Sequence, residues 1–347
     1  MSESLNRKNN FDFLRLVFSS LVIFSHSFPL TKNDEILLVA TNNQLDFGSL
    51  SVDVFFIISG YLIFTSLKYS SSPINYLFKR CLRLFPALFF MLFISLLLLV
   101  FVYTGQNIFK QNDFYSYLPN NLSLYRIQYK VKDIFESNPY PGAINGSLWS
   151  LSYEFTMYLF LLLLYPFRKN RKIVLTALAL SFLFAFLAVT IIPTFLSGIF
   201  AFFRLDSAQM YRLAAFFILG SILSLINSDR LNTKAVKILL LLLIIASLFL
   251  NIYNSTSYIL LPILVIIVGT SYSKTLAYFP EKFGDISYGI YIYGFIIQQT
   301  LLNYFVLNPY ELTFLTLVPT FILSYLSWHF IEKKFLKYKN YTYNFHL

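Results

Sequence analysis

The sequence has few of the residues that build metal centres, disulfides and soluble surfaces. Its 347 residues include one cysteine, Cys81, and three histidines, and only 12% are charged, against about 25% in a typical soluble domain. A single cysteine excludes an intramolecular disulfide and a multi-cysteine zinc or iron–sulfur site. The scarcity of histidine leaves little material for any metal site, and the low charge excludes an ordinary water-soluble domain.

Apolar side chains dominate instead. Hydrophobic residues make up 57% and aromatic residues 20% of the chain, and the mean hydropathy is +0.64. Apolar runs of about 20 residues, each long enough to cross about 30 Å of hydrocarbon, recur along the whole length, whereas an outer-membrane barrel would show alternating segments of about 10 residues. The pattern predicts an all-α, polytopic integral membrane protein with about ten transmembrane helices, near residues 12–30, 50–67, 84–103, 148–167, 173–192, 211–227, 236–253, 257–273, 285–305 and 312–331.

The net charge of +11 follows membrane topology. If the N-terminus is cytoplasmic, 19 of the 27 Lys and Arg residues fall in cytoplasmic segments and six fall outside, while Arg15 and Arg212 lie within spans. This asymmetry predicts that both termini are cytoplasmic. The basic excess therefore indicates a lipid bilayer as partner and does not indicate nucleic acid. We expect one domain over residues 1–347, with a helical core at about 10–337 and a polar outer loop at about 104–146.

Ionisable residues inside the predicted spans are candidates for function, because each costs several kcal/mol unless it is paired or lines a wet cavity. Counting residues from the span ends places four of them at a similar depth near the outer side, and places Arg15 about 16 Å from His26 on nearly the same helix face. Two interpretations are open: the groups pair to tie helices together, or they form a site. The four residues are His26, Asp53, Glu154 and Arg212.

A histidine with nearby carboxylates suits acid–base chemistry. Neutral His26 is a natural general base near pH 7, and a carboxylate, either Asp53 or Glu154, could hold its tautomer and stabilise the imidazolium. At the other end, Arg80 and Arg83 are one helical turn apart, which suits phosphate recognition at a membrane surface or plain interfacial anchoring.

Six blocks of sequence resemble, in order, the motifs of the membrane-bound acyltransferase family 3. In the first block a basic residue, Arg15, is followed by ten residues and then His26. The resemblance covers residues 10–337, with two departures: Tyr293-Gly294 stands where many members have an aromatic residue followed by His, and Ser147 occupies a common proline position. The other five blocks are Asp53–Tyr61, Arg80–Pro86, Asn145–Glu154, Ile286–Tyr293 and Phe330–Lys334.

The resemblance implies transfer of an acyl group, commonly acetyl from cytoplasmic acetyl-CoA, to a hydroxyl of a surface carbohydrate or its lipid-linked precursor. It implies that His26 is the catalytic histidine and that Asp53 and Glu154 are the essential acidic residues. The CoA phosphates are then expected on three arginines, Arg15, Arg80 and Arg83. The implied location is a bacterial-type inner membrane, crossed many times. Many family members also carry a fused extracytoplasmic hydrolase-like domain, but we expect none here because few residues follow the last predicted span. No metal cofactor is expected, because potential metal ligands are scarce.

Several points remain open from the sequence. Trp149, Tyr153 and Arg212 are expected to contact the acceptor, although the two aromatic rings are as well explained by anchoring at the membrane interface. His26 could act as a general base or carry the acyl group transiently, and the acyl group could be succinyl. A carrier or exporter of surface-glycan precursors would use the same buried charges for translocation, and a sensor or structural subunit is a more distant alternative.

Overall fold

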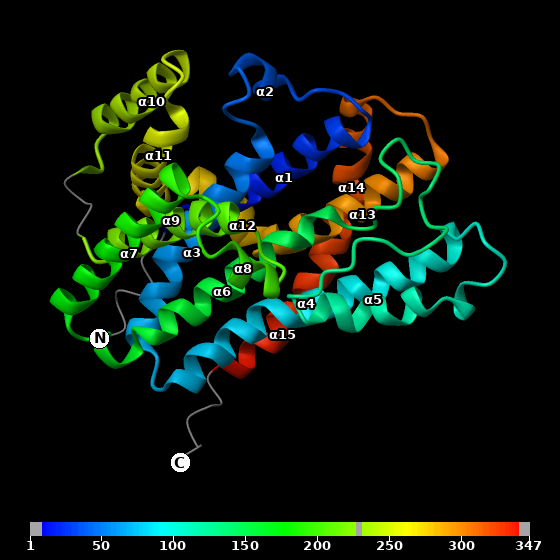
Figure 1. Cartoon of the computed structure of the whole chain (residues 1–347), viewed down its shortest axis with the longest axis horizontal. Helices are drawn as coiled ribbons and strands as arrows, with labels where there is room; N and C mark the ends of the chain where they lie inside the picture. Colours follow the sequence, from blue (N-terminus) through cyan, green and yellow to red (C-terminus); the bar gives the residue numbers. More distant parts are fainter. Residues whose placement is uncertain (1–8, 227–230, 340–347) are drawn as a thin grey trace.

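The structure, a computed structural model, describes residues 9–226 and 231–339, which form helices and connecting segments without a strand (Figure 1). The predicted all-α class is confirmed, and each predicted span coincides with a helix: α1 (Phe11–Leu30), α3 (Phe47–Tyr69), α4 (Pro73–Val102), α6 (Trp149–Leu163), α7 (Arg171–Ile191), α9 (Ser207–Leu223), α10 (Lys234–Phe249), α11 (Tyr253–Thr270), α13 (Ser287–Tyr304) and α14 (Pro309–Ser327). The shorter helices are α2 (Ile36–Ala40), α5 (Asn112–Leu122), α8 (Ser197–Phe202), α12 (Lys274–Phe283) and α15 (Lys333–Leu336).

Six helices in the described chain are long and apolar enough to cross a membrane, so the protein is a multi-pass membrane protein. Other helices are shorter, such as α6 with 15 residues and α10 with 16. The count of ten crossings and the cytoplasmic termini remain predictions. The six helices are α1, α3, α4, α7, α11 and the continuous helical stretch Pro309–Lys339.

Polar caps set where several helices begin. Asp46 precedes α3 and accepts a hydrogen bond from the Ser49 backbone N–H at 2.7 Å. Asp206 does the same for α9, accepting from the Gln209 N–H at 2.8 Å. Such caps satisfy N–H groups that have no partner in the first helical turn. They define the residues at which α3 and α9 begin.

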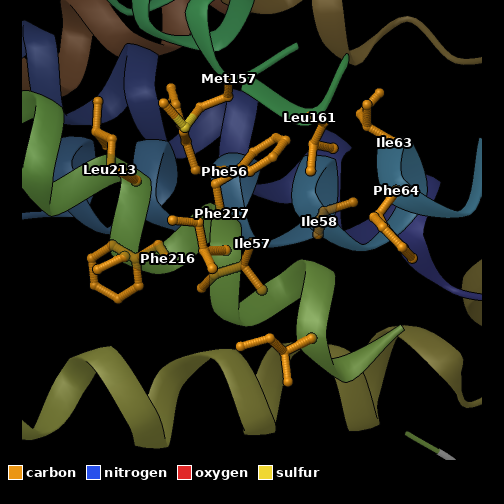
Figure 2. Packing of buried hydrophobic residues seen from close by; sticks show 14 of the residues in the cluster. Phe56, Ile57, Ile58, Ile63, Phe64, Met157, Leu161, Leu213, Phe216 and Phe217 are labelled. Carbon is orange, nitrogen blue, oxygen red and sulfur yellow. The ribbon is translucent and has the colours of Figure 1, made fainter. Parts of the chain in front are cut away.

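The hydrophobic core lies where α3 crosses α9 and α6 (Figure 2). Two glycines permit the crossing. A Cβ atom on Gly60 would lie 1.9 Å from the Phe217 carbonyl oxygen, and one on Gly220 would lie 2.3 Å from the Ile57 carbonyl oxygen. Because close backbone approach through small residues is how membrane helices gain packing energy, this contact ties α3 to α9.

Helix α1 runs through the middle of the bundle and packs on α3, α13 and α14, whereas α10 lies at the edge (Figure 1). Ionisable side chains of α1 can therefore face protein instead of lipid. We call the end of the bundle where α1 and α4 begin the basic end, because Lys79, Arg80 and Lys339 lie there. The end where α1 finishes and α3 begins is the opposite end.

Candidate active site

Helix α6 begins inside the bundle, and this decides where Glu154 lies. The chain before α6 is held by Asn145, which is almost fully buried, donates to the Ile292 carbonyl oxygen at 2.7 Å and accepts from the Ser147 N–H at 3.0 Å. A Cβ atom on Gly146 would lie 2.6 Å from the Phe295 ring. Non-helical backbone at membrane depth is tolerated where protein buries it in this way.

Glu154 is consequently deeper than residue counting suggests. Its carboxylate accepts hydrogen bonds from the Ser59 hydroxyl at 3.0 Å and the Tyr158 hydroxyl at 2.6 Å. Ser59 follows Asp53 by six residues, which is about 9 Å along α3. The expectation that Glu154 lies at the depth of Asp53 is therefore wrong, because it assumed that α6 starts at the membrane surface.

Glu154 faces a cavity of about 510 Å³ between α3, α4, α6 and α13. Five cationic side chains line its basic end: Arg15, Lys79, Arg80, Arg83 and Lys339. The remaining wall is mainly apolar and aromatic, with Val52, Phe55, Leu151, Tyr288 and Tyr291 among its residues. The cavity thus joins a cationic mouth to an apolar interior, which suits a long ligand with an anionic end.

Two of the three predicted phosphate-binding arginines are already paired with carboxylates. Arg83 contacts Asp285 at 2.5 Å and Glu332 at 3.5 Å, and Arg15 lies 3.7 Å from the same Asp285 oxygen. Glu332 is buried and also accepts from the Ser327 hydroxyl at 3.1 Å. These ion pairs fix α1, α4, α13 and the C-terminal helix to one another at the basic end.

Arg80 is different. Its Nη2 donates to the Ser66 hydroxyl at 3.3 Å, and its buried Nε has no hydrogen-bond partner. Within residues 9–226 and 231–339 no carboxylate forms an ion pair with Arg80. A buried guanidinium with an unused donor in the cavity wall is ready to bind an anion.

Asp53 and Arg212 form an ion pair between α3 and α9. The Arg212 Nη1 lies 2.8 and 3.0 Å from the two Asp53 carboxylate oxygens, and its Nε donates to Gln209 at 3.0 Å. Asp53 is almost fully buried. The structure brings these two predicted site residues together, in the arrangement that ties helices.

His26 lies apart from these groups. Its ring meets the edge of the Phe295 ring at a centroid distance of 5.3 Å, and it does not line the cavity. No hydrogen bond or ion pair joins it to Asp53 or Glu154 in the described chain. Tyr291, one turn before Phe295 on α13, lines the cavity, so one helical turn separates the cavity wall from the neighbour of His26.

The two predicted acceptor-binding aromatics lie on another face of α6. Trp149 and Tyr153 pack ring against ring at 5.5 Å, and the Tyr153 hydroxyl accepts from the Asp206 N–H at 2.7 Å. Neither lines the cavity. They connect α6 to the start of α9.

Residue spacing did not predict four acidic residues that lie beside the predicted site residues. Asp285 immediately precedes the block Ile286–Tyr293, and Glu332 lies within the block Phe330–Lys334. The motif blocks could therefore have pointed to both residues. Asp46 and Glu35 lie in the segment between α1 and α3, beside Ser25, the residue before His26, and no motif marks them. Burial and the nearby Asp46 charge raise the pKa of Glu35, although hydrogen bonds from the Phe47 N–H and the Ser25 hydroxyl partly oppose this shift.

Known proteins with similar sequences support membership of the family that the motif blocks resemble. A family model described as an acyltransferase domain matches residues 8–329. The O-acetyl transferase of Shigella phage Sf6 is 30% identical over 345 residues, covering 96% of this chain and 97% of that protein. Nodulation protein 10 of Rhizobium leguminosarum bv. viciae is 29% identical over 358 residues, covering 96% and 95%. No solved structure matches the chain.

A multi-pass helical bundle with a cationic cavity can bind an anionic substrate within the membrane. The family match spans most of the chain and includes all the motif blocks quoted above except the last, Phe330–Lys334, which begins one residue beyond it. The chain therefore belongs to the membrane-bound acyltransferase family 3, and it is an acyltransferase.

Proposed function

We propose that the protein moves an acetyl group from acetyl-CoA in the cytoplasm to a hydroxyl of a surface carbohydrate or its lipid-linked precursor. Both termini would face the cytoplasm of a bacterial-type inner membrane, with the basic end of the bundle on that side. The observation that carries this proposal is the cavity, which runs from Arg80 at the cationic mouth, where no described carboxylate pairs with it, toward Tyr291. The similarity to an O-acetyl transferase supports acetyl and a hydroxyl acceptor.

In this mechanism the CoA phosphates bind at the mouth, chiefly to Arg80, with Lys79 and Lys339 beside it. Arg15 and Arg83 add positive potential while Asp285 and Glu332 hold them in place. The pantetheine arm then lies in the apolar part of the cavity. It follows α3 and α13, and not the face of α1 that joins Arg15 to His26, because His26 does not line the cavity.

His26 accepts the proton of the acceptor hydroxyl as the oxygen attacks the thioester carbonyl carbon. The new ester C–O bond forms, the C–S bond breaks, and the departing CoA thiolate takes up the proton. For this the thioester must pass the Phe295 ring, which contacts His26 and also packs against Gly146. If His26 instead carries the acyl group, labelled acetyl will remain on the protein when no acceptor is present.

The cavity favours an uncharged acyl group over succinyl. All cations among its described lining residues lie at the basic end, and the charged group further in is Glu154. A succinyl carboxylate placed beyond Glu154 would be desolvated without a counterion and would face a like charge. We therefore expect acetyl-CoA to be used in preference to succinyl-CoA.

One comparison tests the proposed function against a carrier or exporter of glycan precursors. The gene is deleted in its host, and the mass of the surface polysaccharide repeat is measured with and without the gene. We expect the deletion to remove the mass of one acetyl group from the modified repeats while the amount of polysaccharide stays the same. Loss of surface polysaccharide with unchanged acetylation of the remainder would favour an exporter and contradict the proposal.

A further inference from the structure

The two carboxylates that the sequence offers to His26 are engaged elsewhere. Asp53 is bound to Arg212 at 2.8 Å, and Glu154 is bound to Ser59 and Tyr158. A histidine that takes a proton away from bulk water needs a nearby negative charge, because an isolated buried imidazolium is unstable. The partner of His26 must therefore come from another part of the bundle.

The end of α1 packs closely on the start of α3. The rings of Phe24 and Phe47 lie 5.7 Å apart. A Cβ atom on Gly48 would lie 2.9 Å from the Ser25 hydroxyl oxygen and 3.1 Å from the Asp46 Oδ1, so both atoms flank the same point. Glycine at position 48 thus allows the Asp46 carboxylate to approach the helical turn that carries Ser25 and His26.

The charged groups around His26 are few. Helix α13 presents the uncharged Phe295 ring, and α14 presents Tyr310, which contacts Phe24 and not the imidazole. Asp46 places its Oδ1 at the point on Gly48 that also faces Ser25, next to His26 in α1, so its negative charge lies beside the turn that carries the imidazole. Glu35 is occupied by the Ser25 hydroxyl and the Phe47 N–H, each at 3.1 Å.

We propose that Asp46 is the positioning residue of His26, stabilising the imidazolium that forms when the acceptor hydroxyl gives up its proton. The role rests on the proposed function, since it presumes that His26 takes this proton. Asp46 uses Oδ1 to cap α3, and its Oδ2 has no hydrogen bond in the described chain. The carboxylate can therefore cap the helix and act on His26 at once.

Asparagine separates these two tasks. Asn caps a helix as well as Asp does but carries no charge, so Asp46→Asn should keep α3 folded and remove only the electrostatic effect. Asp206→Asn is the matched control, because Asp206 caps α9 through the same type of bond without acting on His26. Asp46→Ser provides a second neutral cap if the asparagine variant does not fold.

The test uses the full-length protein in lipid nanodiscs and diethyl pyrocarbonate, which modifies neutral imidazole. Mass spectrometry of the His26 peptide gives the modification rate from pH 3 to 9, and this readout does not depend on any acceptor. We expect the midpoint of this rate to fall by about one pH unit in Asp46→Asn and to stay unchanged in Asp206→Asn. Acetyl transfer should slow at least tenfold at saturating acetyl-CoA with KM unchanged, and Asp46→Glu should recover part of it.

An unchanged midpoint in Asp46→Asn, or an equal change in Asp206→Asn, would overturn the assignment of Asp46 whatever the protein transfers. A shifted midpoint together with a normal transfer rate would also overturn it, since the charge would then have no role in the reaction. Failure of the proposed function would look different: His26→Ala would retain full transfer activity, while the midpoint in Asp46→Asn would still shift.

Discussion

Replacing Arg80 by alanine should weaken acyl-CoA binding and leave the fold intact. The reason is that Arg80 has no carboxylate partner and one buried donor, Nε, without a hydrogen bond in the described chain. Replacing Arg83 by alanine should mainly lower the stability of the fold, because it would leave Asp285 and Glu332 buried without their main counterion. The two arginines are one helical turn apart, so the comparison separates binding from folding.

The magnitudes follow from the contacts. Losing a hydrogen bond to a charged group costs about 1.5–3 kcal/mol, which corresponds to a rise in the Kd for acetyl-CoA of about 10- to 100-fold in Arg80→Ala. Breaking a buried ion pair from one side costs about 3–5 kcal/mol of folding stability, so Arg83→Ala should show a clearly lower Tm. Arg171→Ala is the control, because its guanidinium donates to the Leu225 carbonyl away from the cavity.

Calorimetric titration of acetyl-CoA into nanodisc-embedded protein gives the Kd, and a thermal melt of the same samples gives the Tm. Added salt should weaken wild-type binding more than binding by Arg80→Ala, because the variant has lost a charged contact. Equal affinity in the wild type and Arg80→Ala would refute the phosphate-binding role. A normal Tm in Arg83→Ala would refute the structural role of its ion pairs.

Three further predictions concern stability. Arg212→Ala should destabilise the protein by about 3–5 kcal/mol because it strands buried Asp53, and adding Asp53→Asn should recover much of the loss in chemical unfolding; no recovery would contradict the pairing. Gly220→Ala should lower the Tm, since the new methyl group would meet the Ile57 carbonyl; an unchanged melt would contradict the close crossing. The pKa of Glu35 is raised in the folded state, so its contribution is present below the unfolded pKa and is lost as pH rises through the folded one. Glu35→Gln should therefore lose less stability between pH 4 and 8 in pH-dependent melts, and parallel curves would contradict this.

The sequence predicted the helices well because apolar length and helix caps are local properties. Each predicted span coincides with a helix, and the motif blocks identify the family that the comparisons confirm. Arg80 and Glu154 were predicted site residues, and the structure places both in the wall of one cavity. Their roles as phosphate ligand and essential acid remain predictions.

What the sequence could not predict depends on contacts between distant segments. The depth of Glu154 follows from the bond between Asn145 and the Ile292 carbonyl, which holds the start of α6 inside the bundle. Counting from the start of an apolar run assumes that the run begins at the membrane surface. The pairing of Arg83 with Asp285 likewise joins residues 202 positions apart. A charged residue inside a predicted span is a candidate for function, but the packing of distant helices decides which group it pairs with.

The central claim is that acetyl passes from CoA held in the cavity to an acceptor on the opposite side of the membrane, in a reaction that requires His26. The most direct test reconstitutes wild-type protein and His26→Ala in sealed liposomes, with radiolabelled acetyl-CoA on the side of the basic end. Polysaccharide from cells that lack the gene is placed on the opposite side. The account predicts labelled polysaccharide with wild-type protein and background label with His26→Ala. Equal labelling by the two proteins would contradict it.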